Sequence, residues 1–190
     1  QPPKRVSVLK ISPSADHKTN GFQTQANFRF ANHYIIGGFD YWTRNYDGIR
    51  TRDQKIEILN PADSSVVRTT YKTIYEKPLP DADYSSAGIY LQDEMNLFNN
   101  LNMTLGGRYD FIWLDNAETF NPLYEINDGV VNNNPPGQKV IWEAQSAENK
   151  SYVFNIGLLY SLSDHSNISF NAARSFRSPS LEERYQYIDL

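Results

Sequence analysis

The residues most suited to acid–base chemistry are two pairs of adjacent carboxylates, Asp93-Glu94 and Glu182-Glu183. Hydrolysis by two carboxylates requires both groups to flank one bond. Neighbouring residues of a strand point to opposite faces, so neither pair meets this requirement if it lies in a strand. We expect these side chains to form ion pairs or to carry solvated charge. The pattern predicts no catalytic residue, and we expect a protein that is not an enzyme.

The sequence gives equally little support for metal binding or for nucleophilic catalysis. The three histidines, His17, His33 and His165, are far apart in the sequence, and the chain contains no cysteine. Zinc sites and catalytic triads need several such side chains in one place. We therefore predict no metal site and no cofactor, and we expect the histidines to be solvated in loops and turns.

Glycine pairs occur at Gly37-Gly38 and Gly106-Gly107, but neither lies in a phosphate-binding motif. Glycine inside a strand more often permits a bend or the close approach of another group. The more informative candidates are the arginines Arg44, Arg108, Arg174 and Arg177, whose planar guanidinium groups can hold carboxylates.

Composition limits the kind of protein that positions these groups. The 190 residues include 13 Tyr and 10 Phe, yet the mean hydropathy is −0.60 and the net charge is −4. Acidic and basic residues are interspersed, which argues against nucleic-acid binding. Aromatics that face outward around a polar interior would give this composition, and so would a loop-rich surface protein.

Alternation with a period of two dominates the chain and predicts strands. In GGRYDFIWLDN (106–116), Tyr109, Phe111 and Trp113 share one face, whereas Arg108 and Asp110 share the other. One helix is expected at SLEERYQYI (180–188). The predicted strands, six or seven in number, cover 6–11, 22–30, 33–47, 84–98, 101–113, 151–162 and 167–177.

The connections between these strands are unequal. Residues 31–33, 99–100 and 164–166 form tight turns, whereas 47–84 and 115–149 are long loops, and 12–21 is expected to be a further loop. A transmembrane barrel has short turns at one end and long loops at the other, with an apolar outer face and a polar lumen. An aromatic girdle is then predicted at the long-loop ends of the strands, formed by Tyr41, Trp42, Phe111, Trp113 and Tyr152.

A soluble β-sandwich fits the same alternation, because the pattern does not say which face meets water. That alternative predicts that Phe28, Phe154 and Tyr160 are buried. No apolar run reaches the roughly 20 residues of a transmembrane helix, and the N-terminal segment lacks the apolar core of a signal peptide.

Three segments carry a recognisable pattern: HYIIGGFDYWTRN (33–45), GIYLQDEMNLFNNLNMTLGGRYDF (88–111) and FRSPSLEERY (176–185). They resemble segments of TonB-dependent outer-membrane receptors of the siderophore or haem type. HYIIGGFDYWTRN (33–45) is similar to their H-x-x-x-G-G-x-D-Y strand, and GIYLQDEMNLFNNLNMTLGGRYDF (88–111) resembles their paired Y-x-Q-D-E and L-G-x-R-Y-D strands. FRSPSLEERY (176–185) resembles their F-R-x-P-x-L-x-E segment. The three segments follow the family's order.

The resemblance implies an antiparallel up-and-down meander that forms part of a 22-stranded transmembrane β-barrel. Residues 1–190 would be a partial barrel domain, an excised piece without the plug. It implies the outer membrane of a Gram-negative bacterium, and TonB-driven import of an iron chelate, either a ferric siderophore or haem. The partners would be the plug domain of the full-length chain, TonB and outer-membrane lipid, with no nucleic acid. A passive porin and a soluble β-sandwich binding domain are the alternatives.

Site residues follow from this arrangement. The lumen glycines Gly38 and Gly106 would make room for plug contacts. In the haem receptors of the family, a box similar to Phe176, Arg177 and Pro179 precedes a ligand histidine, but no histidine follows Arg177 here. The residues predicted to face the lumen or plug are Asp40, Arg44, Gln92, Glu94, Arg108 and Asp110. Those predicted to contact the ligand are Arg50, Arg52, Tyr71, Tyr75, Tyr124, Trp142, Phe176 and Arg177.

Overall fold

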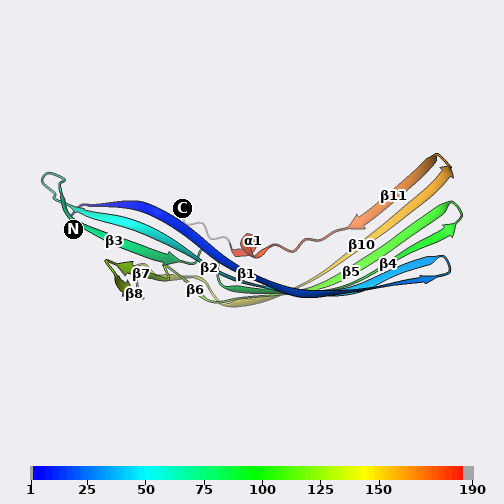
Figure 1. Ribbon diagram of the computed structural model, residues 1–190, viewed down its shortest axis with the longest axis horizontal. Coiled ribbons are helices and arrows are strands. Elements are labelled where there is room, and N and C mark those ends of the chain that lie inside the picture. The colour runs from blue at the N-terminus through cyan, green and yellow to red at the C-terminus, as the bar shows by residue number, and fades with distance from the viewer. Residues whose placement is uncertain (1, 186–190) are drawn as a thin grey trace.

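The computed structural model describes residues 2–185, and β-structure dominates that part of the chain (Figure 1). Eleven strands and one short helix are formed within it. They are β1 Lys4–Phe30, β2 His33–Leu59, β3 Val66–Glu76, β4 Ala82–Phe98, β5 Leu101–Asn116, β6 Thr119–Asn121, β7 Tyr124–Asn127, β8 Val130–Asn132, β9 Lys139–Trp142, β10 Gln145–Ser163, β11 Ser166–Arg174 and α1 Leu181–Tyr185.

Six long strands form an antiparallel meander in the order β1-β2-β4-β5-β10-β11. Tight turns after Phe30, Phe98 and Ser163 join them in pairs at one end. The sheet curls into a trough, and its strands splay apart toward the turns (Figure 1). The predicted all-β meander is therefore confirmed, and the predicted helix is present in the part of 180–188 that the structure describes.

The expected loop at 12–21 is wrong, because β1 continues through it as one strand of 27 residues. Its backbone pairs with β2 from Ser12 opposite Thr51 to Gly21 opposite Trp42. The polar side chains of this segment do not prevent strand formation, because backbone hydrogen bonds to β2 hold the strand. Pro13 is accommodated because β1 pairs with a neighbour on one side only.

The two long connections are also more regular than expected. Within 47–84, β2 continues to Leu59 and turns back as β3, leaving only 60–65 and 77–81 outside strands. Within 115–149 there are four short strands. The β7–β8 hairpin turns at Asp128-Gly129, where both residues have positive φ, as a type I′ turn requires. Irregular loops are thus a wrong description of both segments.

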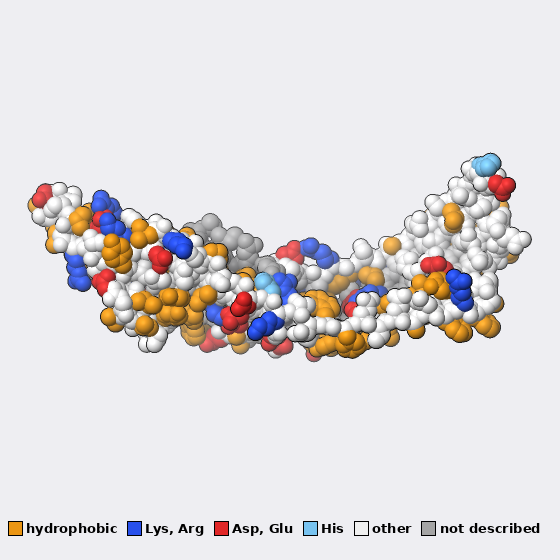
Figure 2. All heavy atoms as spheres, in the orientation of Figure 1, with side chains coloured by type: hydrophobic (Ala, Val, Ile, Leu, Met, Phe, Trp, Pro, Cys, Tyr) orange, Lys and Arg blue, Asp and Glu red, His pale blue; other side chains and the backbone are white. Residues whose placement is uncertain are grey.

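The meander presents two chemically different faces. The face that carries Phe28, Phe39, Tyr109 and Phe154 is apolar, and we call it the convex face; the opposite, concave face carries Asp40 and Arg108. Figure 2 shows hydrophobic side chains gathered along the lower, convex edge of the sheet. Phe28, Phe154 and Tyr160 are 60%, 50% and 42% exposed, which contradicts the soluble sandwich.

The only cluster of buried hydrophobic residues in the described chain lies on the concave face, near the long-loop end. There α1 crosses the inside of the trough (Figure 1) and packs Leu181 and Tyr185 against β4 and β5. Trp42 lies on this face and stacks on Tyr84, with ring centroids 4.8 Å apart. Its predicted place in an outward girdle is therefore wrong. No helix among residues 2–185 is long and apolar enough to cross a membrane.

Candidate functional site

Arg108 is the centre of an ion-pair cluster on the concave face. Its Nη1 and Nη2 lie 2.6 and 3.0 Å from the two carboxylate oxygens of Asp40. Its Nε donates to Asp110 Oδ1 at 2.8 Å. The three residues come from β2 and β5, which are separated by β4. The fork of one guanidinium therefore bridges two strands across a third, using the bidentate geometry that arginine favours.

Gly88 of β4 makes this bridge possible. It lies between Asp40 and Asp110 in the register of the three strands. A Cβ at this position would overlap the guanidinium of Arg108. Tyr90, two residues further along β4, has its ring centroid 6.0 Å from Arg108 Cζ.

Toward the turns, the concave face continues with polar side-chain contacts that are not ion pairs. Tyr90 donates its hydroxyl to Gln25 at 3.0 Å, and Gln92 donates to Glu94 at 2.9 Å. The space beside Gly38 is filled by the Tyr90 side chain, and that beside Gly106 by Asn155. The space beside these glycines is therefore taken by side chains of the same wall.

Two of the three histidines have side-chain partners, contrary to expectation, whereas His165 lies exposed in the turn between β10 and β11. His33 Nδ1 lies 2.7 Å from Asp93 Oδ2. His17, within β1, has its Nδ1 2.7 Å from Arg44 Nη2, and both side chains lie on the concave face. Arg174 differs: its register partner is Phe154, so it lies on the convex face and not in the lumen.

Arg50 and Arg52 lie on the concave face of β2 beyond the meander, and both hold Glu76 of β3. Arg50 Nε donates to Glu76 at 2.8 Å, and Arg52 forms a second ion pair with the same carboxylate. Glu76 is buried. Strand β3 was not predicted from the sequence. The alternation in VVRTTYKTIYE (66–76) would have indicated it, and with it Glu76 as a partner for arginines of a neighbouring strand.

The predicted ligand tyrosines point the other way. Tyr75 and Tyr124 stack with ring centroids 4.2 Å apart, on the face opposite to Arg50 and Arg52. Burial raises the pKa of the Tyr124 phenol, as does the neighbouring hydroxyl of Tyr75. Tyr71 lies on the same face and is exposed. The structure thus brings the two arginines together and separates them from all three tyrosines.

The remaining ligand candidates lie apart from both groups. Trp142 packs edge-on against Tyr185, with ring centroids 5.4 Å apart. Phe176 is exposed, and Arg177 forms an exposed ion pair with Glu183.

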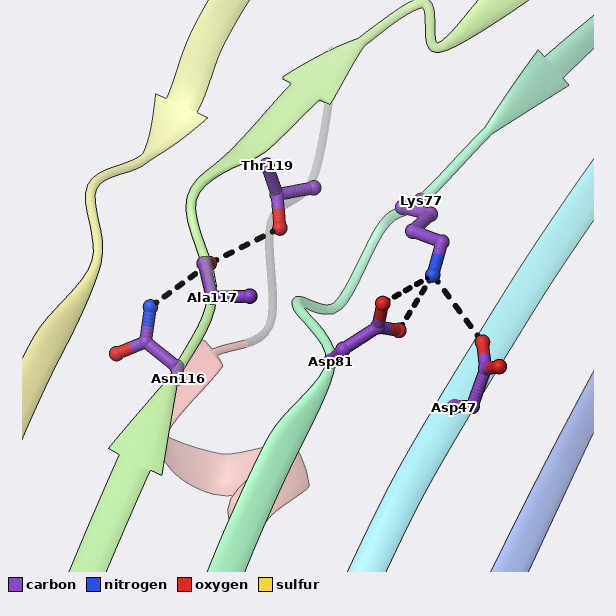
Figure 3. Close-up of polar contacts among 6 residues, drawn as sticks. All are labelled: Asp47, Lys77, Asp81, Asn116, Ala117 and Thr119. Atoms are coloured by element: carbon purple, nitrogen blue, oxygen red, sulfur yellow. Dashed lines mark hydrogen bonds and ion pairs between the residues drawn. The ribbon is translucent and has the colours of Figure 1, made fainter.

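A second ion cluster ties the meander to the β2–β3 hairpin, at the point where β2 exchanges neighbour β4 for neighbour β3. Lys77 Nζ lies 2.5 Å from both oxygens of Asp81 and 3.1 Å from Asp47 (Figure 3). Burial alone would lower the pKa of Lys77, but the hydrogen bonds from its ammonium group to both carboxylates raise it. Beside it, Asn116 and Thr119 both donate to the Ala117 carbonyl (Figure 3).

Among the described residues, no group of three or more His, Cys, Asp or Glu side chains is placed so that it could hold a metal ion. The arrangement is a curved wall whose polar side is cross-linked by ion pairs and whose apolar side is exposed.

Comparison with protein families shows what kind of protein contains this wall. The family model described as TonB dependent receptor-like, beta-barrel matches residues 8–188. The chain belongs to the TonB-dependent receptor family. Barrels of this family are outer-membrane proteins, so the convex face of the meander meets lipid and the concave face lines the lumen. No curated protein matched the chain.

Proposed function

We propose that this chain is part of the barrel wall of an active-transport receptor in the outer membrane of a Gram-negative bacterium, one that imports an iron chelate with energy from TonB. The observation that carries the proposal is the charge-compensated polar wall on the concave face, opposite the exposed apolar convex face. Such a wall suits a wet lumen that a moving domain or solute must pass. Its role is transport and not catalysis.

The plug domain of the full-length receptor is the proposed neighbour of this wall. Asp40, Arg108 and Asp110 retain partial exposure toward the lumen, with 18%, 31% and 17% of each side chain accessible. Gln92 and Glu94 lie on the same face, nearer the turns. These groups can exchange partners with polar groups of a plug when it rearranges.

The ligand is proposed to be a ferric siderophore or haem, both of which present anionic groups on a rigid frame. Arg50 and Arg52 support this, because they lie on the lumenal side beyond the membrane-spanning part and remain about one third exposed while holding Glu76. A guanidinium fork suits carboxylate or chelate oxygens. Phe176 and Arg177 of the FRSP segment are the second proposed contact.

Growth on defined iron sources tests the proposal. A strain that lacks the gene of the full-length receptor is supplied with ferric siderophores or with haem as the only iron source. Wild-type receptor should restore growth on one of them. Arg50→Ala/Arg52→Ala with Glu76→Gln should raise the required concentration about tenfold, as expected for loss of charge-assisted hydrogen bonds.

Lys10→Ala is the matched control, because Lys10 lies at a similar level on the opposite face of the same sheet. It should leave growth unchanged at equal surface abundance of the receptor. Growth that is indifferent to every iron source would defeat the uptake proposal. Uptake that persists in a strain without TonB would favour a passive porin.

A further inference from the structure

The convex face contains a hollow of about 850 Å³ that the proposed transport function does not use. It forms because two residues of one register row, Gly37 and Gly107, have no side chain to cover the sheet. A Cβ on Gly107 would meet nothing closer than the Val153 carbonyl oxygen at 3.9 Å. The hollow is bounded by the next row toward the long-loop end, which consists of Phe39, Ile89, Tyr109 and Tyr152.

A second hollow, of about 600 Å³, continues from the first across Gly107 and Leu91. It is lined mainly by apolar side chains of β5 and β10, among them Leu105 and Phe154. Asp93 also borders it, and its carboxylate is held by His33. Together the two hollows make an elongated apolar depression that faces the lipid.

Two cations lie at the long-loop end of this depression. The Arg174 guanidinium stacks on Tyr152, with Cζ 3.7 Å from the ring centroid, and donates to the Tyr152 carbonyl. Lys150 Nζ lies 5.9 Å from the ring of Phe111, one row beyond Tyr152. Tyr152 itself lines the hollow, so the cations and the depression are contiguous.

Both cations are exposed, and neither forms an ion pair with any carboxylate among residues 2–185. They differ in this from Arg50, Arg52 and Arg108, each of which holds a carboxylate. An unpaired cation on a lipid-facing surface is costly unless it reaches the headgroup region.

The position of Arg174 meets that condition. It is the last residue of β11, which has 9 residues from the turn to this point. A barrel strand needs about 9–11 residues to cross the hydrocarbon core. Arg174 therefore lies where the strand leaves the apolar layer, at the level of phosphate groups.

We propose that this surface is a binding site for a lipid of the outer leaflet whose headgroup carries phosphate. An acyl chain would occupy the depression over Gly37 and Gly107. Its phosphate would lie between Arg174 and Lys150, which would supply the charge-assisted hydrogen bonds. The proposal requires only that the chain spans the outer membrane and does not depend on which solute is transported.

Native mass spectrometry of the full-length receptor in detergent tests the site. The probes are bisphosphorylated lipid A, the same lipid without its phosphates, and inorganic phosphate. Wild-type receptor should retain the bisphosphorylated lipid. Arg174→Gln/Lys150→Gln should weaken its retention about tenfold, the scale of a lost charge-assisted contact. Gly107→Leu, which fills the depression, should weaken it to a similar extent.

Lys18→Gln removes a cation from the convex face away from the hollow and is the matched control. It should retain the lipid as the wild type does. Equal retention by the charge variant, or equal retention of the dephosphorylated lipid, would overturn the proposal. Displacement of the lipid by millimolar inorganic phosphate would also overturn it, because the cations would then bind a free anion. If Gly107→Leu fails to fold, the charge variant decides alone.

Discussion

Individual charged residues on the concave face are held by partners. Arg108 bridges Asp40 and Asp110, and Arg50 and Arg52 share Glu76. A wall of uncompensated arginines would hold any anion that entered the lumen, whereas paired arginines exchange one carboxylate for another at small net cost. This suits the proposed function, in which a ligand or plug would move along the surface.

Arg108→Ala is expected to lower the free energy of unfolding of the full-length receptor by about 1–3 kcal/mol. The range lies below that of a fully buried pair because all three side chains are partly exposed. The loss arises because two carboxylates remain close together without a cation. Urea unfolding measures it, with Arg108→Ala/Asp40→Asn as the comparison. The double variant should recover part of the loss, and equal stability of wild type and Arg108→Ala would contradict the role of the cluster.

Glu57, in the part of β2 beyond the membrane, provides a pH-dependent contact. Hydrogen bonds from Arg5 and Lys55 lower the pKa of Glu57 to about 2. The folded-state pKa lies below the unfolded value of about 4.3. Its stabilisation is therefore complete above that value and is lost as the pH falls toward 2.

Hydrogen exchange at pH 6, 4 and 3 measures this contact. After correction for intrinsic exchange rates, protection of the paired segments of β1 and β2 near Glu57 should decrease between pH 4 and 3 in the wild type. Glu57→Gln should show lower protection at pH 6 and a weaker dependence on pH. Identical pH profiles for both proteins would show that Glu57 does not stabilise this pairing.

At the level of elements, alternation was sufficient for the membrane-spanning strands and their turns. It placed Tyr109 and Arg108 on the correct opposite faces because period two is a property of the strand itself. It failed for 12–21, where pairing with a distant strand decides the conformation. The girdle prediction for Trp42 failed because it disregarded this alternation, which places Trp42 on the same face as Asp40, where it packs against the cluster covered by α1.

The same dependence on strand pairing explains why the contacts of the site could be predicted only in part. The sequence indicated that arginines such as Arg108 could hold carboxylates, but only the register of β2, β4 and β5 shows that Arg108 reaches both Asp40 and Asp110. Arg50 and Tyr75 were grouped because both lay in one supposed loop. The β2–β3 pairing places them on opposite faces. Composition of a segment does not reveal such a division.

Gly88→Ala tests how closely β4 must approach the cluster. The new methyl group would displace the Arg108 side chain, which is fixed by two carboxylates. We expect a loss of stability similar to that of Arg108→Ala, measured by urea unfolding. Gly107→Ala in the neighbouring strand is the control, since its methyl group has open space. Loss of stability in the control and none in Gly88→Ala would contradict the packing described.

At the scale of the whole molecule, the chain is a curved wall with a different solvent on each side. A membrane barrel reverses the usual arrangement of a soluble protein, because its aromatics face lipid and its ion pairs face water. The lumenal cluster, the extracellular arginines and the lipid-facing hollow all depend on this orientation.

Spin labels at single cysteines test the orientation most directly, and residues 1–190 contain no native cysteine that would also be labelled. Labels are placed in turn at Gln25, Ala26, Asn27 and Phe28 of β1 in the bilayer-reconstituted full-length receptor. The account predicts high accessibility to oxygen at positions 26 and 28, and high accessibility to a water-soluble nickel chelate at 25 and 27. The reverse pattern, or no alternation along the strand, would contradict it.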